Sequence, residues 1–140
     1  MTATPTKTLN ARRSGIYLAP KSVSRLQQAA NQAGLVWFDL ELKPVTDKAG
    51  LLAVCRQALG FPETFGANWD ALADCLQDFS WRRAPGYVIN LMHTASFART
   101  EPQDFSLLLE ILDSAASYWK EQGKIFVALV GHPHGGLTAF

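Results

Sequence analysis

The chain has 140 residues, of which 48% are hydrophobic and 18% are charged, and its formal net charge is +1. This composition excludes a disordered chain and a strongly basic nucleic-acid-binding protein, and the length suits one domain rather than two. No apolar run approaches the roughly 20 residues that a membrane-spanning helix needs, so the sequence predicts no membrane association.

Short apolar runs alternate with helical periodicity along the chain. The predicted strands cover residues 15–18, 35–38, 87–92 and 125–130, and the predicted helices cover residues 22–33, 47–59, 69–77 and 102–122. The predicted N-caps are Ser22, Asp47 and Asn68. Strands that alternate with helices predict a single α/β domain with a mainly parallel sheet of three to four strands, covered by helices.

This domain is expected to cover residues 15–130, between two tails. Residues 1–14 are rich in Thr and basic residues and lack the apolar run of a secretion signal, which predicts a flexible tail. Residues 131–140 have a Gly-rich, loop-like start and are interpreted as a C-terminal tail. His132 and His134 lie in this tail, but no Cys or carboxylate adjoins them, so no metal site is predicted.

The charges are unevenly distributed. Residues 1–38 contain five Lys or Arg and no Asp or Glu, whereas residues 57–81 contain four Asp or Glu and no Lys or Arg. The basic residues are spread thinly over their segment, so no direct binding of nucleic acid is expected. The acidic segment is the stronger signal.

The chain has two cysteines, Cys55 and Cys75, each inside a predicted helix. Their spacing fits no metal or redox motif, so the expectation is two reduced thiols in a cytoplasmic protein. A single disulfide between them is the alternative that the sequence leaves open.

Within the acidic segment, residues 69–77 have an apolar face at helical spacing. Its members are Trp69, Leu72, Ala73 and Leu76. A stripe of carboxylates is predicted on another face, at i, i+4 and i+8: Asp70, Asp74 and Asp78. Asp is a poor residue for a helix interior and like charges at i, i+4 repel, so this stripe costs local stability.

Two interpretations of the stripe remain open. It is either a solvated polar face, paired with Arg82, Arg83 or the basic N-terminal region, or a surface for a cationic partner. The preceding loop favours a partner, because Gly66 permits a positive φ and Asn68 caps the helix. Together they would fix the loop and place Phe65 beside the carboxylates.

The motif Phe65-Gly66-x-Asn68-x-Asp70-Ala71-Leu72-x-Asp74-Cys75-Leu76 resembles the binding segment of barstar-like ribonuclease inhibitors. The resemblance covers residues 35–130, and residues 15–34 would be an N-terminal addition of one strand and one helix. It implies a bacterial, cytoplasmic inhibitor that is monomeric when free. It also implies that an acidic loop and helix block the basic active site of an extracellular-type ribonuclease.

The resemblance also implies roles for single residues. Asp74 would be the central anchor and Asp70 an edge contact, while the loop residues Phe65, Gly66 and Asn68 shape and contact the partner. Asp78 and Trp81 complete the predicted partner-binding set. No catalytic residue, metal or cofactor is implied. Residues Thr64, Ala67 and Ala73 depart from the best-known family member, which predicts a different specificity.

Two other functions remain as alternatives. One is a non-inhibitory protein-interaction module on the same fold. The other is a small metal-dependent hydrolase that uses Asp70, Asp74 and His93. An enzyme is not expected, because the chain has no Gly-rich phosphate loop and no nucleophile in a recognised setting.

Overall fold

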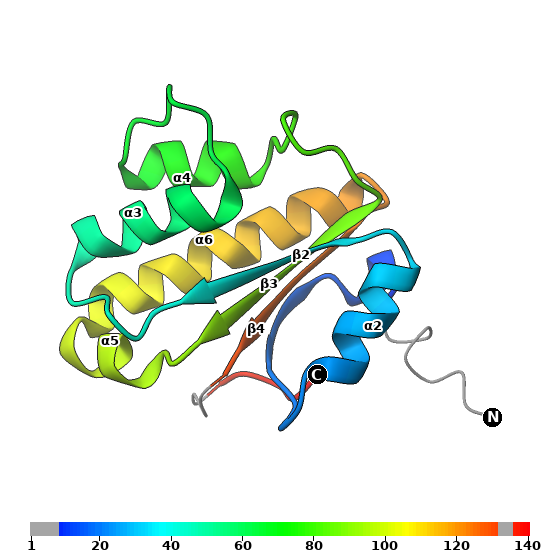
Figure 1. The fold of residues 1–140 in the computed structure, drawn as a ribbon, viewed down its shortest axis with the longest axis horizontal. Coiled ribbons are helices and arrows are strands. Elements are labelled where there is room, and N and C mark those ends of the chain that lie inside the picture. Colours follow the sequence, from blue (N-terminus) through cyan, green and yellow to red (C-terminus); the bar gives the residue numbers. More distant parts are fainter. Residues whose placement is uncertain (1–8, 132–135) are drawn as a thin grey trace.

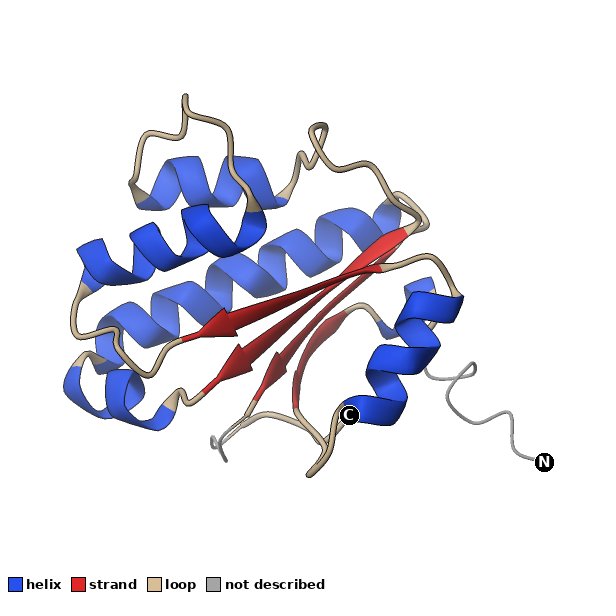
Figure 2. Cartoon of the chain, viewed as in Figure 1, coloured by secondary structure: helices blue, strands red, loops and turns tan. Residues whose placement is uncertain are grey.

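The computed structural model describes residues 9–131 and 136–140 (Figures 1 and 2). His132 and His134, considered above as metal ligands, lie outside the described residues. Among the described residues, no helix combines the length and the apolar character needed to cross a bilayer.

A four-stranded parallel sheet forms the centre of the molecule, with strand order β1-β4-β3-β2. The strands are β1 (Gly15–Leu18), β2 (Val36–Glu41), β3 (Gly86–Met92) and β4 (Ile125–Val130). The helices are η1 (Ala11–Arg13), α2 (Ser24–Gln32), α3 (Lys48–Leu59), α4 (Trp69–Leu76), α5 (Ala95–Thr100) and α6 (Pro102–Glu121). The predicted α/β fold with a parallel sheet is therefore confirmed.

The helices lie on both faces of this sheet. The chain crosses from β1 to the far edge strand β2 through α2, and then returns strand by strand through β3 to β4. Because crossovers of parallel strands share one hand, connections that run in opposite directions cover opposite faces. Figure 1 shows this arrangement, with α2 on one face and α3, α4 and α6 on the other.

Each face has its own apolar core. The larger core, under α3, α4 and α6, includes Leu51, Leu72, Leu76, Phe79, Tyr87, Phe105, Leu112 and Phe126. The smaller core, under α2, comprises Leu9, Leu26, Ala30, Leu35, Val88, Val127 and Leu129. Side chains of β3 and β4 enter both cores, as expected of central parallel strands.

Several boundaries differ from the sequence expectations. Strand β2 begins at Val36 and continues to Glu41, beyond the predicted 35–38. Its polar Asp39 is exposed on this edge strand, and the side chain accepts hydrogen bonds from Trp37 Nε1 at 2.9 Å and Asn90 Nδ2 at 3.1 Å. The short helix α5 was not predicted. Helix α2 begins at Ser24 with no side-chain cap at Val23, so the expected cap at Ser22 is wrong.

Residues expected in the two tails pack against the domain where they are described. Leu9 is buried, and Ser14 Oγ both donates to the Lys124 carbonyl at 3.1 Å and accepts from the Phe126 N–H at 3.0 Å. Near the other end, the Phe140 N–H donates to the Leu18 carbonyl at 3.0 Å. The Arg13 guanidinium lies 4.4 Å from the Phe140 ring centroid. Residues 9–14 and 137–140 thus extend the β1 edge of the domain.

Candidate partner-binding site

The loop between α3 and α4 is held in place by aromatic packing. Gly60, with φ 68°, caps the end of α3 after Leu59, and the Phe61 side chain is then buried in the core. The Phe61 and Phe65 ring centroids lie 4.9 Å apart, and the Phe65 N–H donates to the Pro62 carbonyl at 2.9 Å. Phe65 is half-buried. The loop therefore has a defined shape before any partner binds.

The corner at the end of this loop differs from the expectation in one respect. The residue with positive φ is Ala67, at 52°, and not Gly66. At Gly66 a Cβ would lie 3.3 Å from Asn68 Nδ2, a tight contact that would require the Asn68 side chain to shift slightly. The glycine thus leaves room for the Asn68 side chain, and Ala67 carries the unusual backbone conformation.

Asn68 caps α4, as its sequence position predicted. Its extended backbone has φ −138° and ψ 173°, and its Oδ1 accepts a hydrogen bond from the Ala71 N–H at 2.7 Å. The other end of α4 is bound by α6, because Trp119 Nε1–H donates to the Leu76 carbonyl at 2.8 Å. Leu72 and Leu76 are fully buried beneath the helix. Both termini and the inner face of α4 are therefore fixed.

Asp70 and Asp74 are exposed on α4, one helical turn apart. Within residues 9–131 and 136–140, the recorded ion pair is His93–Glu41, and neither aspartate pairs with Arg82, Arg83 or the basic N-terminal segment. The interpretation as a face neutralised by nearby arginines is therefore not supported in this part of the chain. In the described part of the chain, these two carboxylates therefore face solvent and form no ion pair.

Asp78 does not continue the predicted stripe, because α4 ends at Leu76. Its N–H donates to the Cys75 carbonyl at 3.1 Å in a tight turn, and its carboxylate accepts from Ser80 Oγ at 3.1 Å. Phe79 then adopts φ 50° and enters the core, with its ring centroid 4.2 Å from that of Tyr87. Asp78 lies at the helix end rather than on the helical face.

The two cysteines are free thiols, so the alternative of a disulfide is wrong. Burial raises the pKa of Cys55 to about 12. The pKa of Cys75 is also raised, first by burial and then by the negative charges of Asp78 and Asp74. The two aspartates thus make the electrostatic potential at the Cys75 thiol more negative.

Trp81, the last residue of the predicted set, is half-buried against the base of the loop. Its Nε1–H donates to the Leu59 carbonyl at 3.3 Å, and its ring centroid lies 5.7 Å from that of Phe61 and 5.3 Å from that of Phe79. Trp81 links the end of α3 to the turn after α4. Its contacts are those of a residue that supports the loop.

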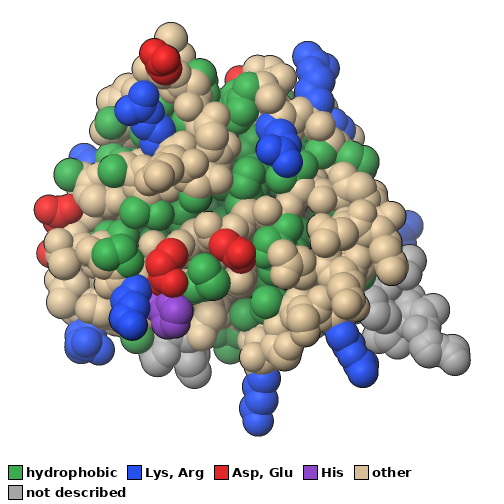
Figure 3. Space-filling model, in the orientation of Figure 1, with side chains coloured by type: hydrophobic (Ala, Val, Ile, Leu, Met, Phe, Trp, Pro, Cys, Tyr) green, Lys and Arg blue, Asp and Glu red, His purple; other side chains and the backbone are tan. Residues whose placement is uncertain are grey.

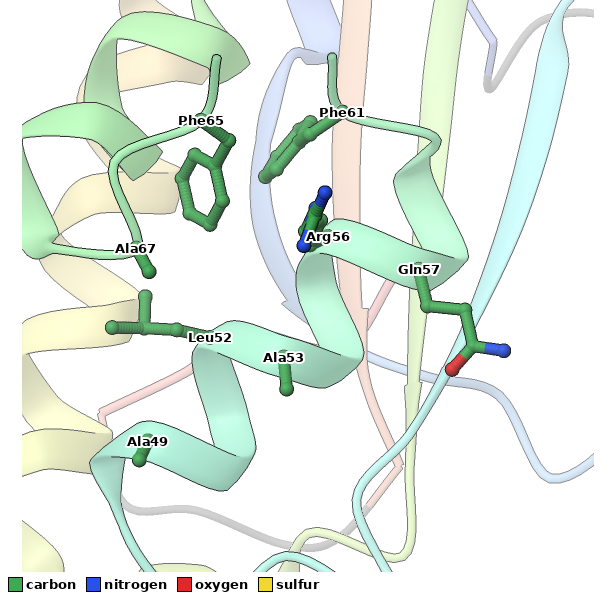
Figure 4. Close-up of a pocket in the computed structure, with 8 residues that line it drawn as sticks. All are labelled: Ala49, Leu52, Ala53, Arg56, Gln57, Phe61, Phe65 and Ala67. Atoms are coloured by element: carbon green, nitrogen blue, oxygen red, sulfur yellow. The ribbon is translucent and has the colours of Figure 1, made fainter. Parts of the chain in front are cut away.

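The structure also contains a groove that the sequence does not predict. It lies between α3 and the loop, has a volume of about 470 Å³, and is lined by Ala49, Leu52, Ala53, Arg56, Gln57, Phe61, Phe65 and Ala67 (Figure 4). In the sequence, the groove is indicated only by two small residues, Ala49 and Ala53, one turn apart on α3. Such a pair forms a groove only where another segment of the chain packs beside it, and the sequence does not show that the loop does so.

The residues proposed for a metal-dependent hydrolase do not assemble. His93 Nδ1 lies 2.7 Å from Glu41 Oε2, at the ends of β3 and β2, whereas Asp70 and Asp74 lie on α4. Figure 3 shows a His side chain beside acidic side chains on one face of the molecule. Burial tends to raise the pKa of Glu41, but hydrogen bonds from Lys43 and His93 and their charges lower it overall. Among the described residues, no three His, Cys, Asp or Glu side chains form a candidate metal cluster.

The fold and the site define a single-domain α/β protein that presents a rigid loop and a short acidic helix. The Barstar (barnase inhibitor) family matches residues 35–131. This match covers most of the chain, and the protein therefore belongs to that family.

No curated protein matches the chain. Among solved structures, the ORC2 protein of Aeropyrum pernix in ADPNP–ADP complexes is similar, with 17% identity and a TM-score of 0.56. The similarity covers 84% of this chain but 35% of that one, so the chain spans about a third of the ORC2 protein. At this identity, the likeness concerns the fold alone.

Proposed function

We propose that this protein is a cytoplasmic inhibitor of a bacterial, extracellular-type ribonuclease. The inhibitory surface is the loop of residues 61–68 together with α4, which covers the basic active site of the enzyme. One observation carries the proposal: Asp70 and Asp74 are exposed, without a cation in the described part of the chain, on a helix that is fixed at both ends. The family name points to the class of enzyme.

The chemistry of a ribonuclease active site suits this surface. Such a site binds RNA phosphates with cationic side chains, and carboxylates at the same positions satisfy those cations. Asp74 is the proposed anchor because it lies between Asp70 and Asp78 along the acidic segment, and Asp70 is the proposed edge contact. Asp78, at the helix end, contributes negative charge.

The rigidity of the loop favours tight binding. Phe65, Gly66 and Asn68 already hold the corner in one conformation, so little conformational entropy is lost on association. Trp81 supports the same loop from beneath. The free protein is proposed to be a monomer, and its two free thiols suit a reducing compartment.

The test is a binding and inhibition assay with barnase and a panel of other small, basic bacterial ribonucleases. Wild type is expected to bind and inhibit at least one of them. Asp74→Ala is expected to weaken that binding by about 2–5 kcal/mol, roughly 30-fold to several-thousand-fold, because a buried cation in the partner loses its carboxylate. Circular dichroism and thermal unfolding would establish that the variant is folded.

Glu110→Ala is the matched control, because it removes one exposed carboxylate from α6 and should leave affinity unchanged. A folded Asp74→Ala that binds as tightly as wild type would refute the site. Binding without any slowing of RNA cleavage would support the non-inhibitory interaction module instead.

A further inference from the structure

The groove between α3 and the loop adjoins the proposed inhibitory surface. Its floor is formed by two almost fully buried side chains, Leu52 at 2% exposed and Phe61 at 6%. Ala49 and Ala53 line it from α3, and Ala67 from the loop. In Figure 4 the rings of Phe61 and Phe65 lie close together above Leu52, whereas Gln57 extends away from them.

Small residues keep this groove open. Ala49 and Ala53 are exposed and one turn apart on α3, and their methyl groups form one wall of the groove. A larger side chain at either position would fill part of the groove. Its volume of about 470 Å³ falls in the range of sites that bury a drug-sized ligand, and it is ample for one large side chain. The walls are mostly apolar and aromatic, which is the character of the pockets that receive anchor residues at protein interfaces.

The charge of the groove is opposite to that of α4. Arg56 is the one charged residue in its lining, and in the described part of the chain it is exposed and has no ion-pair partner. Asp70 and Asp74 lie beyond the loop on the next helix. A partner that contacts both surfaces therefore meets a negative helix and a positively rimmed apolar groove side by side.

We infer that the groove is a second recognition site, which takes an aromatic side chain of the partner with a carboxylate beside it that pairs with Arg56. This inference rests on the proposed function, because the same ribonuclease is the partner. Any basic active site satisfies Asp70 and Asp74, whereas the groove selects among such enzymes. A partner with a basic residue opposite Arg56 is rejected by like-charge repulsion.

The chemistry of the groove is testable without a ribonuclease. The probes are indole-3-acetate, an aromatic carboxylate, and tryptamine, an aromatic amine, titrated into ¹⁵N-labelled protein. Indole-3-acetate is expected to shift the amide signals of residues 49–57 and 61–67, and tryptamine is expected to leave them in place. Arg56→Glu should reverse this preference, and Ala53→Trp should abolish binding by filling the groove.

Gln28→Trp is the control for Ala53→Trp, because it adds the same side chain at an exposed position of α2, on the other face of the sheet. It should leave the shifts caused by indole-3-acetate unchanged. If neither probe binds the groove, or both bind equally well, the inferred chemistry is wrong.

The second arm uses a ribonuclease that wild type inhibits. Arg56→Glu is expected to weaken binding about fivefold to tenfold, and Arg56→Lys to weaken it less, because the charge is retained. If Asp74→Ala loses affinity while Arg56→Glu and Ala53→Trp bind like wild type, the groove inference fails and the proposed function stands. If no ribonuclease binds wild type, the partner assignment falls with the proposed function, and the shift data alone decide the groove chemistry.

Discussion

At the scale of single residues, the acidic face of α4 combines exposed carboxylates with a nearby thiol. Asp74 and Asp78 flank Cys75 in the sequence, and their charges together with burial raise the pKa of its thiol. Cys55 is shielded in the core, and burial raises its pKa to about 12. The charges of the proposed binding surface therefore affect the pKa of Cys75, whereas burial alone accounts for the raised pKa of Cys55.

This difference predicts the reactivity of Cys75. Asp74→Asn removes one negative charge, which lowers the pKa of the thiol and raises its thiolate fraction at pH 8. The rate of Cys75 alkylation by iodoacetamide is expected to rise by roughly twofold. Peptide mass spectrometry would measure the rate, with Cys55 as an internal control that stays unmodified in the folded protein. An unchanged Cys75 rate would mean that Asp74 does not contribute to the local potential.

At the scale of elements, α4 is too short to be stable alone. It has eight residues, whereas isolated helices of fewer than about 12–15 residues are marginal in water. Its conformation depends on the Asn68 cap, on the burial of Leu72 and Leu76, and on the hydrogen bond from Trp119 to the Leu76 carbonyl. These contacts offset the repulsion between Asp70 and Asp74 on the outer face.

The cap is the most accessible of these contacts to mutation. Asn68→Ala is expected to lower the free energy of unfolding by about 1 kcal/mol, because the Ala71 N–H loses its acceptor. Asn68→Asp should retain most of the stability, since its carboxylate also accepts this bond and favours a helix N-terminus. Urea unfolding would measure both variants, with Asn31→Ala on α2 as an exposed control. Equal stability of Asn68→Ala and wild type would contradict the role of the cap.

At the scale of the whole molecule, different parts of the chain cover the two faces of the sheet. The family match begins at Leu35, and α3, α4 and α6 with the proposed surface lie on one face. The preceding β1 and α2 add an edge strand and cover the other face, where Val88, Val127 and Leu129 would otherwise contact solvent. The described residues before the family match, from Leu9 to Gly34, thus have a structural role, since α2 and its neighbours complete the second core.

Much of this fold could be predicted because its signals are local. Helical periodicity, the Asp47 and Asn68 caps and the glycines after α3 and α6 indicated α3, α4 and α6, and apolar runs indicated all four strands. The features that escaped prediction depend on distant contacts. Asp78 leaves the helix because Phe79 enters the core, and β2 continues through Asp39, whose side chain is exposed at the sheet edge and accepts from Asn90 on the neighbouring strand β3.

The sequence predicts which residues form the candidate site, but it does not predict the shape of the surface that they form. Its residues are adjacent in the chain, so Asn68, Asp70 and Asp74 could be placed on one loop and helix from the sequence alone. The positive φ of Ala67 and the groove beside it arise from the way the loop folds back over α3. Neither has a local sequence signal of its own.

The central claim is that the acidic helix occupies the active site of a ribonuclease. The most direct test is steady-state cleavage of RNA by a bound ribonuclease, measured over a range of RNA concentrations at fixed inhibitor concentrations. Occupation of the active site predicts that the apparent KM rises with inhibitor while kcat stays constant, because RNA and inhibitor exclude each other. A fall in kcat at constant KM would show that both bind at once, and would contradict this account.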